Sequence, residues 1–165
     1  MICECRLAEA RDFAPIARLL ELYQYELSDI WDQDLDAAGE YGYDLARHRK
    51  AATSFAHIAF VDGLPAGFAL VAPAIVTRNE GCWMEQFFVL KKHRRTGVGR
   101  ALAQHVFACH PGPWEVGQIA ANLPARSFWR QVIGELTHGR FVEVEVREGW
   151  WLGTVQQFEL APRTR

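Results

Sequence analysis

The stretch that decides the fold is FFVLKKHRRTGVGRALAQHVF, residues 87–107. An apolar run ends at Leu90, two glycines follow at Gly97 and Gly99, and a helical pattern then begins. Five basic residues lie within ten positions of the apolar run: Lys91, Lys92, Arg94, Arg95 and Arg100. A strand that leads through such a loop into a helix directs backbone N–H groups and the positive end of the helix dipole at one point. The pattern predicts a phosphate or pyrophosphate site; the alternative is a solvated basic turn with incidental glycines.

The residues of this loop match neither of two common nucleotide-binding motifs. A P-loop needs Gly-Lys-Ser/Thr, but Gly99 is followed by Arg100-Ala101. A dinucleotide fingerprint needs a third glycine where this chain has Leu102. The phosphate ligand must therefore be recognised by another kind of loop.

The elements expected along the chain alternate between strands and helices. Apolar periodicity predicts helices over 16–27, after the glycine loop at 98–109, and from Asn122 as N-cap with Pro124 in the first turn. Val98, Leu102, Val106 and Cys109 are the expected buried stripe of the second helix. Strands are expected at 2–7, 55–61, 64–71, 82–90, 114–121, 141–146 and 151–160, with a hairpin turn at Asp62-Gly63. This order indicates a single α+β (mixed α/β) domain over residues 1–165.

Composition excludes several classes of protein. The chain has 165 residues, half of them hydrophobic, and no apolar run approaches the roughly 20 residues of a membrane span. A formal net charge of −2 argues against a nucleic-acid binder. The first five residues do not form a signal peptide. Neither CxxC nor zinc-like His spacing occurs, so we expect no metal, no disulfide framework, and buried, reduced cysteines in a cytoplasmic protein.

Two blocks resemble the GNAT superfamily of N-acetyltransferases. The run Arg94-Arg95-Thr96-Gly97-Val98-Gly99 resembles that family's acyl-CoA pyrophosphate loop, Gln/Arg-x-x-Gly-x-Gly/Ala. The run from Asn122 to Trp129, with Ala125 and Phe128, resembles its Asn-x-x-Ala-x-x-Phe-Tyr block. Lys91 stands where the family often has proline, and Trp129 replaces the tyrosine. The resemblance implies a central, mostly antiparallel twisted sheet flanked by helices, with acetyl-CoA as co-substrate.

The resemblance also implies which residues hold the coenzyme. Backbone groups at the end of the central strand would contact the pantetheine arm, the glycine loop would hold the pyrophosphate, and the asparagine and its helix would flank the far end of the arm. The residues concerned are Phe87, Phe88, Val89, Arg94, Arg95, Thr96, Gly97, Val98, Gly99, Arg100, Asn122, Ala125, Phe128 and Trp129.

In this family an amine attacks the thioester directly. An alkyl amine with a pKa near ~10 is mostly protonated at pH 7, so a base must take a proton. Glu85 is the candidate base, since strand alternation puts it on the face of Val89. The alternative is a glutamate at the rim, paired with an arginine. The usual acid is the tyrosine, and an indole N–H at Trp129 cannot release a proton at useful pH.

The acceptor side is predicted to be acidic and aromatic. Residues 19–46 contain eight carboxylates and no Lys or Arg, with Trp31, Tyr41 and Tyr43 interleaved. The resemblance places this segment beside the acceptor cleft, where it would attract a small cationic amine. The alternative is a solvated acidic loop.

Two other functions are compatible with the sequence. A non-catalytic acyl-CoA-binding or regulatory module of the same fold would explain the missing tyrosine. An aromatic terminal hairpin, with Trp150, Trp151 and Phe158, would offer a subunit interface, and so a homodimer, in either case.

Overall fold

The Asp62-Gly63 turn joins β2 (Phe55–Val61) to β3 (Leu64–Pro73) in the computed structural model, which describes residues 1–74 and 76–162. Asp62 and Gly63 have φ angles of 49° and 80°, the combination that a tight type I′ hairpin turn requires. The Asp62 carboxylate also accepts a hydrogen bond of 2.8 Å from the backbone N–H of Ile2. This turn therefore fixes both the hairpin and the start of the neighbouring strand, β1 (Cys3–Leu7).

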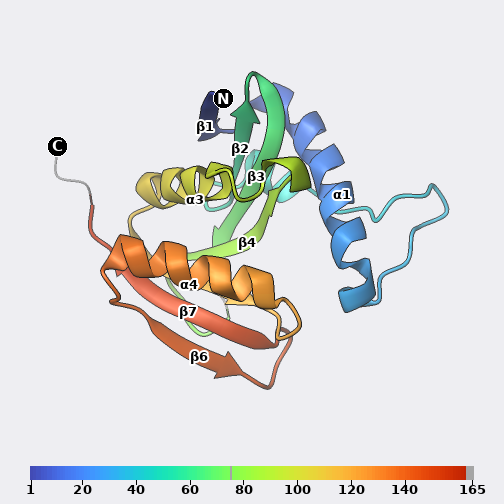
Figure 1. The fold of residues 1–165 in the computed structure, drawn as a ribbon. Coiled ribbons are helices and arrows are strands. Elements are labelled where there is room, and N and C mark those ends of the chain that lie inside the picture. The colour runs from blue at the N-terminus through green and yellow to red at the C-terminus, as the bar shows by residue number, and fades with distance from the viewer. Residues whose placement is uncertain (75, 163–165) are drawn as a thin grey trace. The chain divides into compact units, whose positions relative to one another are not determined.

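The strands form one seven-stranded sheet in the order β1-β2-β3-β4-β5-β7-β6. The strands β6 and β7 lie side by side (Figure 1). The remaining strands are β4 (Cys82–Val89), β5 (Gly112–Gln118), β6 (Val142–Val146) and β7 (Gly153–Leu160). β1 pairs with β2, and β7 pairs with both β5 and β6, in antiparallel register. β4 and β5 are parallel, as expected for strands joined through a helix. The predicted mixed α/β fold with a mostly antiparallel sheet is confirmed.

Four α-helices accompany the sheet: α1 (Phe13–Trp31), α2 (Ala46–Lys50), α3 (Val98–Cys109) and α4 (Leu123–Thr137). Short 3-10 turns precede α1 at Ala10–Asp12 and follow β4 at Lys91–His93. The sequence did not predict α2, because its five residues, ARHRK, carry no apolar periodicity. Among the described residues, no helix combines the length and apolar character that crossing a membrane requires.

Contacts between residues divide the chain into two compact units. Unit 1 contains Met1–Leu70 and Gln86–Leu102, and unit 2 contains Val71–Glu85 and the chain from Ala103 onward. Each unit has its own hydrophobic core. That residues 1–165 behave as one domain stays a prediction.

The core of unit 1 lies between α1 and strands β2, β3 and β4. Ile16 and Leu20 of α1 pack against a cluster that includes Ile58, Phe68 and Phe88. These α1 residues recur at helical spacing, so one face of the helix is apolar and buries itself against the sheet.

The core of unit 2 is aromatic. The Phe107 ring lies edge-on to Trp114 at 4.8 Å and to Phe158 at 5.3 Å. Trp114 and Phe158 are opposite each other in the β5–β7 register and their rings are nearly parallel. On the other face of the sheet Trp83 and Trp151 meet edge-on at 5.3 Å.

The aromatic residues of the terminal hairpin differ in exposure. Phe158 is only 3% exposed and Trp151 packs on Trp83, whereas Trp150 is 67% exposed. That this hairpin forms a subunit interface stays a prediction. The expectation of buried cysteines is wrong. The cysteines are free but not buried: Cys3 and Cys109 are exposed, and Cys5 and Cys82 are intermediate. Cys109 is the last residue of α3, where Ala103 and Phe107 complete the buried stripe instead.

Candidate active site

The loop after β4 has the backbone of an anion site. Gly97 has φ 93°, a conformation that side-chain-bearing residues rarely adopt, and a Cβ built on it would meet no atom within 4 Å. Its carbonyl accepts the first bond of α3, from Ala101 N–H at 2.9 Å. The N–H groups of Val98 and Gly99 precede that bond and so have no partner inside the helix. Open space at Gly97, N–H groups that the helix itself leaves without a partner, and the positive end of α3 therefore lie within three residues of each other.

Side chains and turns hold the loop in this shape. Thr96 Oγ1 donates a hydrogen bond of 2.7 Å to the carbonyl of His93, and the N–H of His93 bonds to the carbonyl of Leu90 at 2.9 Å. Arg95 has φ 61°, a strained value for a residue with a side chain. The loop residues Arg94–Gly97 are all exposed.

Arg94 is engaged within unit 1. Its two terminal nitrogens donate to the two carboxylate oxygens of Glu26 on α1, each at 2.7 Å. Its Nε donates to the carbonyl of Val89 at 2.9 Å, and its guanidinium lies 5.6 Å from the Phe88 ring. Arg94 thus ties α1 to the end of β4 and to the start of the loop, and Glu26 balances its charge.

At the end of β4, the groups available to a ligand belong to the backbone rather than to the side chains. Phe88 is buried in the core of unit 1, 5.5 Å from Tyr23 and 6.0 Å from Phe68, so its ring faces away from any ligand at the surface. The N–H of Leu90 pairs with Ala66 on β3 at 2.9 Å. Because neighbouring residues in a strand point their polar groups to opposite edges, the N–H of Val89 points away from β3.

Glu85 lies on β4 and is partly buried. The parallel ladder between β4 and β5 covers two residue pairs within the described chain, Cys82 with Trp114 and Trp83 with Glu115. Glu85 therefore lies just beyond the part of β4 that pairs with β5. Whether it is the base stays a prediction.

The sequence reasoning missed a second glutamate, Glu115 on β5. Glu115 is fully buried and accepts hydrogen bonds from the backbone N–H groups of Val76 and Thr77, at 3.2 and 2.7 Å, and from the Thr77 hydroxyl. It anchors the segment between β3 and β4, which is a structural role. Gly117, two residues on, is needed because a Cβ there would lie 2.3 Å from the Trp83 ring.

α4 begins as predicted. The Asn122 side chain caps it by accepting a bond of 3.3 Å from the N–H of Ala125. Trp129 is 5% exposed, with its ring 5.0 Å from Phe128 and 6.1 Å from Phe107. The residue at the family's tyrosine position is therefore part of the core of unit 2.

A polar network connects α4 with β6 and was also missed. Arg130 donates to Glu143 at 2.7 Å, and Glu143 accepts from Gln156 at 3.3 Å. Gln156 and Gln118 exchange hydrogen bonds of 2.7 and 2.9 Å in the buried sheet. The alternating sequence VEVEV of β6 was the available signal, since it puts both glutamates on one face.

Much of the acidic segment is used within unit 1. Glu21 accepts from the backbone N–H groups of Tyr41 and Gly42, and Glu26 binds Arg94. Asp36 accepts from two N–H groups of its own loop, and Asp44 from the first residue of α2. Within residues 19–46, the carboxylates for which the structure describes no hydrogen bond or ion pair are Asp29, Asp32 and Asp34.

The three predicted acceptor aromatics differ in exposure. Trp31 is 38% exposed and meets Tyr23 edge-on at 5.9 Å. Tyr43 packs against the core of unit 1, and Tyr41 is half-buried. Trp31 is thus the member of the set with most surface to offer.

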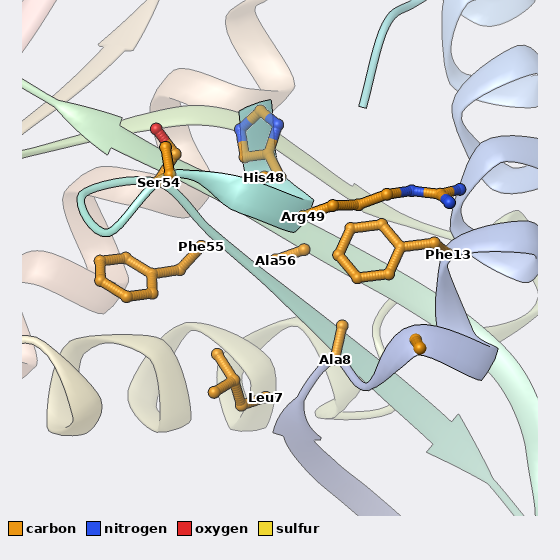
Figure 2. Close-up of a pocket in the computed structure, with 10 residues that line it drawn as sticks. Leu7, Ala8, Phe13, His48, Arg49, Ser54, Phe55 and Ala56 are labelled. Carbon is orange, nitrogen blue, oxygen red and sulfur yellow. The ribbon is translucent and has the colours of Figure 1, made fainter. Parts of the chain in front are cut away.

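A cavity of about 300 Å³ lies elsewhere in unit 1 (Figure 2). Its walls come from the end of β1, the start of α1, α2 and the start of β2, and include Phe13, His48, Arg49 and Ser54. The Arg49 guanidinium lies 4.8 Å from the Phe13 ring. None of the predicted site residues lines this cavity.

The comparisons with known proteins agree with the fold. The sequence matches the acetyltransferase (GNAT) family over residues 16–134. No curated protein sequence matches the chain.

Solved structures match over nearly the whole chain. One is the PaiA N-acetyltransferase of Thermoplasma acidophilum in complex with coenzyme A, at 10% identity and TM-score 0.65, covering 96% of this chain and 99% of that one. Another is the ribosomal-protein-S18-alanine N-acetyltransferase of Escherichia coli, at 12% identity and TM-score 0.65, covering 99% and 97%. A GNAT acetyltransferase of Staphylococcus aureus Mu50 gives 12% identity and TM-score 0.66, covering 97% and 100%.

The sheet order, the glycine loop at the start of α3 and the family match together define an acyl-CoA-dependent transferase. The chain belongs to the GNAT family of acetyltransferases, and it is an N-acetyltransferase of that family.

Proposed function

We propose that the protein transfers the acetyl group of acetyl-CoA to a small cationic primary amine. The observation that carries the coenzyme side is the loop at Gly97, where open space lies beside N–H groups that have no partner within α3. A pyrophosphate there would accept hydrogen bonds from Val98 and Gly99 and lie at the positive end of the helix. The charges of Arg95 and Arg100 would add attraction, while Arg94 would act by holding the loop in place.

The pantetheine arm would bind along the free edge of β4. The carbonyl of Val89 already accepts from Arg94, so the N–H of Val89 is the group we assign to the arm or to the thioester oxygen. Phe87 and Phe88 would contribute backbone. That Asn122, Ala125 and Phe128 also take part stays a prediction of the family resemblance.

The transfer needs a base and an oxyanion donor. We assign the base to Glu85, which takes one proton from the incoming ammonium, directly or through water, so that the nitrogen lone pair can attack the thioester carbon. A backbone N–H on β4 then stabilises the negative oxygen. The nitrogen gives up its second proton to solvent as the C–S bond breaks with its electrons on sulfur. Solvent then protonates the thiolate, because a buried indole at Trp129 cannot supply the proton.

The cationic acceptor is supported by the carboxylates that have no described structural partner. Asp29, Asp32 and Asp34 lie at the end of α1 and just after it, near the exposed ring of Trp31. Exposed negative charges raise the local concentration of a cation, and an aromatic ring adds a cation–π contact.

The coenzyme site is tested by calorimetry with CoA on two matched variants. Gly97→Asp adds a Cβ and a negative charge beside the proposed pyrophosphate, and should weaken CoA binding by at least about tenfold. Gly149→Asp makes the same change at an exposed turn glycine with φ 108° and equally open surroundings. Equal CoA affinity in both variants would show that the loop does not hold the coenzyme.

The reaction is tested by free thiol release from acetyl-CoA against a panel of amines. The panel pairs each cationic amine with a neutral or anionic analogue of similar size. We expect turnover with small cationic primary amines and little or none with their neutral or anionic analogues. CoA binding without turnover over the whole panel would instead favour the non-catalytic acyl-CoA-binding module.

We also propose a cytoplasmic location, since four free thiols are typical of a reducing compartment. A homodimer would have to use surfaces other than Trp151 and Phe158, which are internal to unit 2. Sedimentation of the wild type and of Trp150→Ser tests whether the exposed indole takes part.

A further inference from the structure

Two thiols meet on an outer strand of the sheet. β1 is at the edge of the strand order and pairs only with β2. The Sγ atoms of Cys3 and Cys5 are 4.0 Å apart, although two positions along a strand separate their Cα atoms by about 6.7 Å. The two side chains therefore converge, and Cys3 is exposed to solvent.

The surroundings of the thiols are apolar. Cys3 is opposite Val61 and Cys5 is opposite Ala59 in the β1–β2 register, and directly opposite residues share a face of the sheet. The charged neighbours Glu4 and Arg6 point to the other face by alternation, where Arg6 lies 5.0 Å from the Phe60 ring. These β-strand neighbours thus add no oxygen or nitrogen ligand to the two sulfurs.

A disulfide between these residues would be strained. A Cα separation of about 6.7 Å is at the upper limit for a disulfide, and the sulfurs would have to approach to about 2.05 Å. A shared metal ion fits better, because metal–thiolate bonds of about 2.3 Å allow two sulfurs on one ion to be up to about 4.6 Å apart. The pair is therefore spaced to chelate rather than to oxidise.

We propose that Cys3 and Cys5 form a two-coordinate site for copper(I). Thiolates select soft ions, of which copper(I) is the common biological case, whereas structural zinc takes four ligands. On binding, both S–H bonds break, two Cu–S bonds form, two protons leave to solvent, and copper keeps its oxidation state. The site belongs to β1 and β2 and is independent of acetyl transfer.

The test is a competition for copper(I) under anaerobic conditions, with bathocuproine disulfonate as the competing chelator. The wild type should retain one copper(I) per chain, and Cys3→Ser/Cys5→Ser should lose it. The matched variant Cys82→Ser/Cys109→Ser removes the other two thiols, one of which lies 3.7 Å from His105 Nε2, and should retain the ion. The single variant Cys3→Ser, at an exposed position, should lose copper as well, which guards against misfolding of the double variant.

X-ray absorption should find two sulfur neighbours around the ion and no nitrogen. Retention of copper by Cys3→Ser/Cys5→Ser, or its loss from Cys82→Ser/Cys109→Ser, would overturn the assignment. So would one tightly held zinc per wild-type chain under the same conditions, because structural zinc takes four ligands and the assigned site has two.

Discussion

Arg94 and Glu26 form a bidentate ion pair, with both nitrogen–oxygen distances at 2.7 Å, and the same guanidinium holds the carbonyl of Val89. The family motif suggests Arg94 as a phosphate ligand, but all three of its guanidinium nitrogens donate hydrogen bonds within unit 1. Geometry of this kind depends on the planar fork of arginine, which lysine cannot reproduce.

Arg94→Lys and Arg94→Gln should weaken CoA binding by similar amounts, roughly fivefold, because both lose the fork whether or not they keep the charge. Arg95, whose predicted contribution is its charge, provides the contrast. Arg95→Lys should bind CoA like the wild type and Arg95→Gln should bind it less tightly. Calorimetry on the four variants checks this, and full rescue by Arg94→Lys would mean that Arg94 contributes charge after all.

Glu85→Gln should lower kcat by roughly 10²- to 10⁴-fold, with little change in the affinity for CoA, because it keeps the size of the side chain and removes the base. Initial rates across pH, measured with the best amine, should lose the limb that depends on a deprotonated base. Glu80→Gln, at an exposed position just before β4, serves as the control and should leave the profile unchanged. A normal profile in Glu85→Gln would direct attention to a water relay.

The acidic face should steer the acceptor. Changing Asp29, Asp32 and Asp34 together to Asn should raise the KM of a cationic acceptor and flatten its rise with salt, because screening acts over about 10 Å at 0.1 M. Asp32 has φ 48°, which asparagine also tolerates, so the fold is preserved. The control changes Glu80, Glu148 and Glu159 to Gln, the same change of three charges at exposed sites elsewhere. If both triple variants behave alike, only net charge matters and the segment is a solvated surface.

Glu143 should make unit 2 sensitive to acid. Burial alone would raise the pKa of Glu143, but hydrogen bonds from Arg130 and Gln156 outweigh it and lower that pKa below its usual 4.5. The unfolded chain then binds the proton first as pH falls, so stability is present above pH 4.5 and is lost as pH falls through the lower folded pKa. Urea midpoints between pH 6 and 3 should decline less steeply for Glu143→Gln than for the wild type. Glu148→Gln, at an exposed turn, should decline like the wild type.

The sequence was most informative where local chemistry decides the structure. Asp62-Gly63 specifies its turn through two positive φ angles, Asn122 specifies a helix start, and Gly97 specifies an open backbone loop. Each of these depends on neighbours within a few residues, so a single sequence predicts it.

Interactions between distant segments were not predictable in this way. Glu115 was not recognised, because its partners Val76 and Thr77 lie almost forty residues earlier. Arg94 matched a ligand motif, and nothing near it in the chain indicates Glu26, 68 residues away. Cys109 has the spacing of a core residue, but the helix ends there.

The position of β7 between β5 and β6 has a kinetic consequence. β6 precedes β7 in the chain and pairs with it alone among the described strands, so until β7 docks, β6 has no strand partner and β5 keeps one edge unpaired. A second molecule in the same state presents an identical β5 edge, with which β7 can also pair. Refolding at high protein concentration should therefore divert chains into exchanged dimers that dilution during folding avoids.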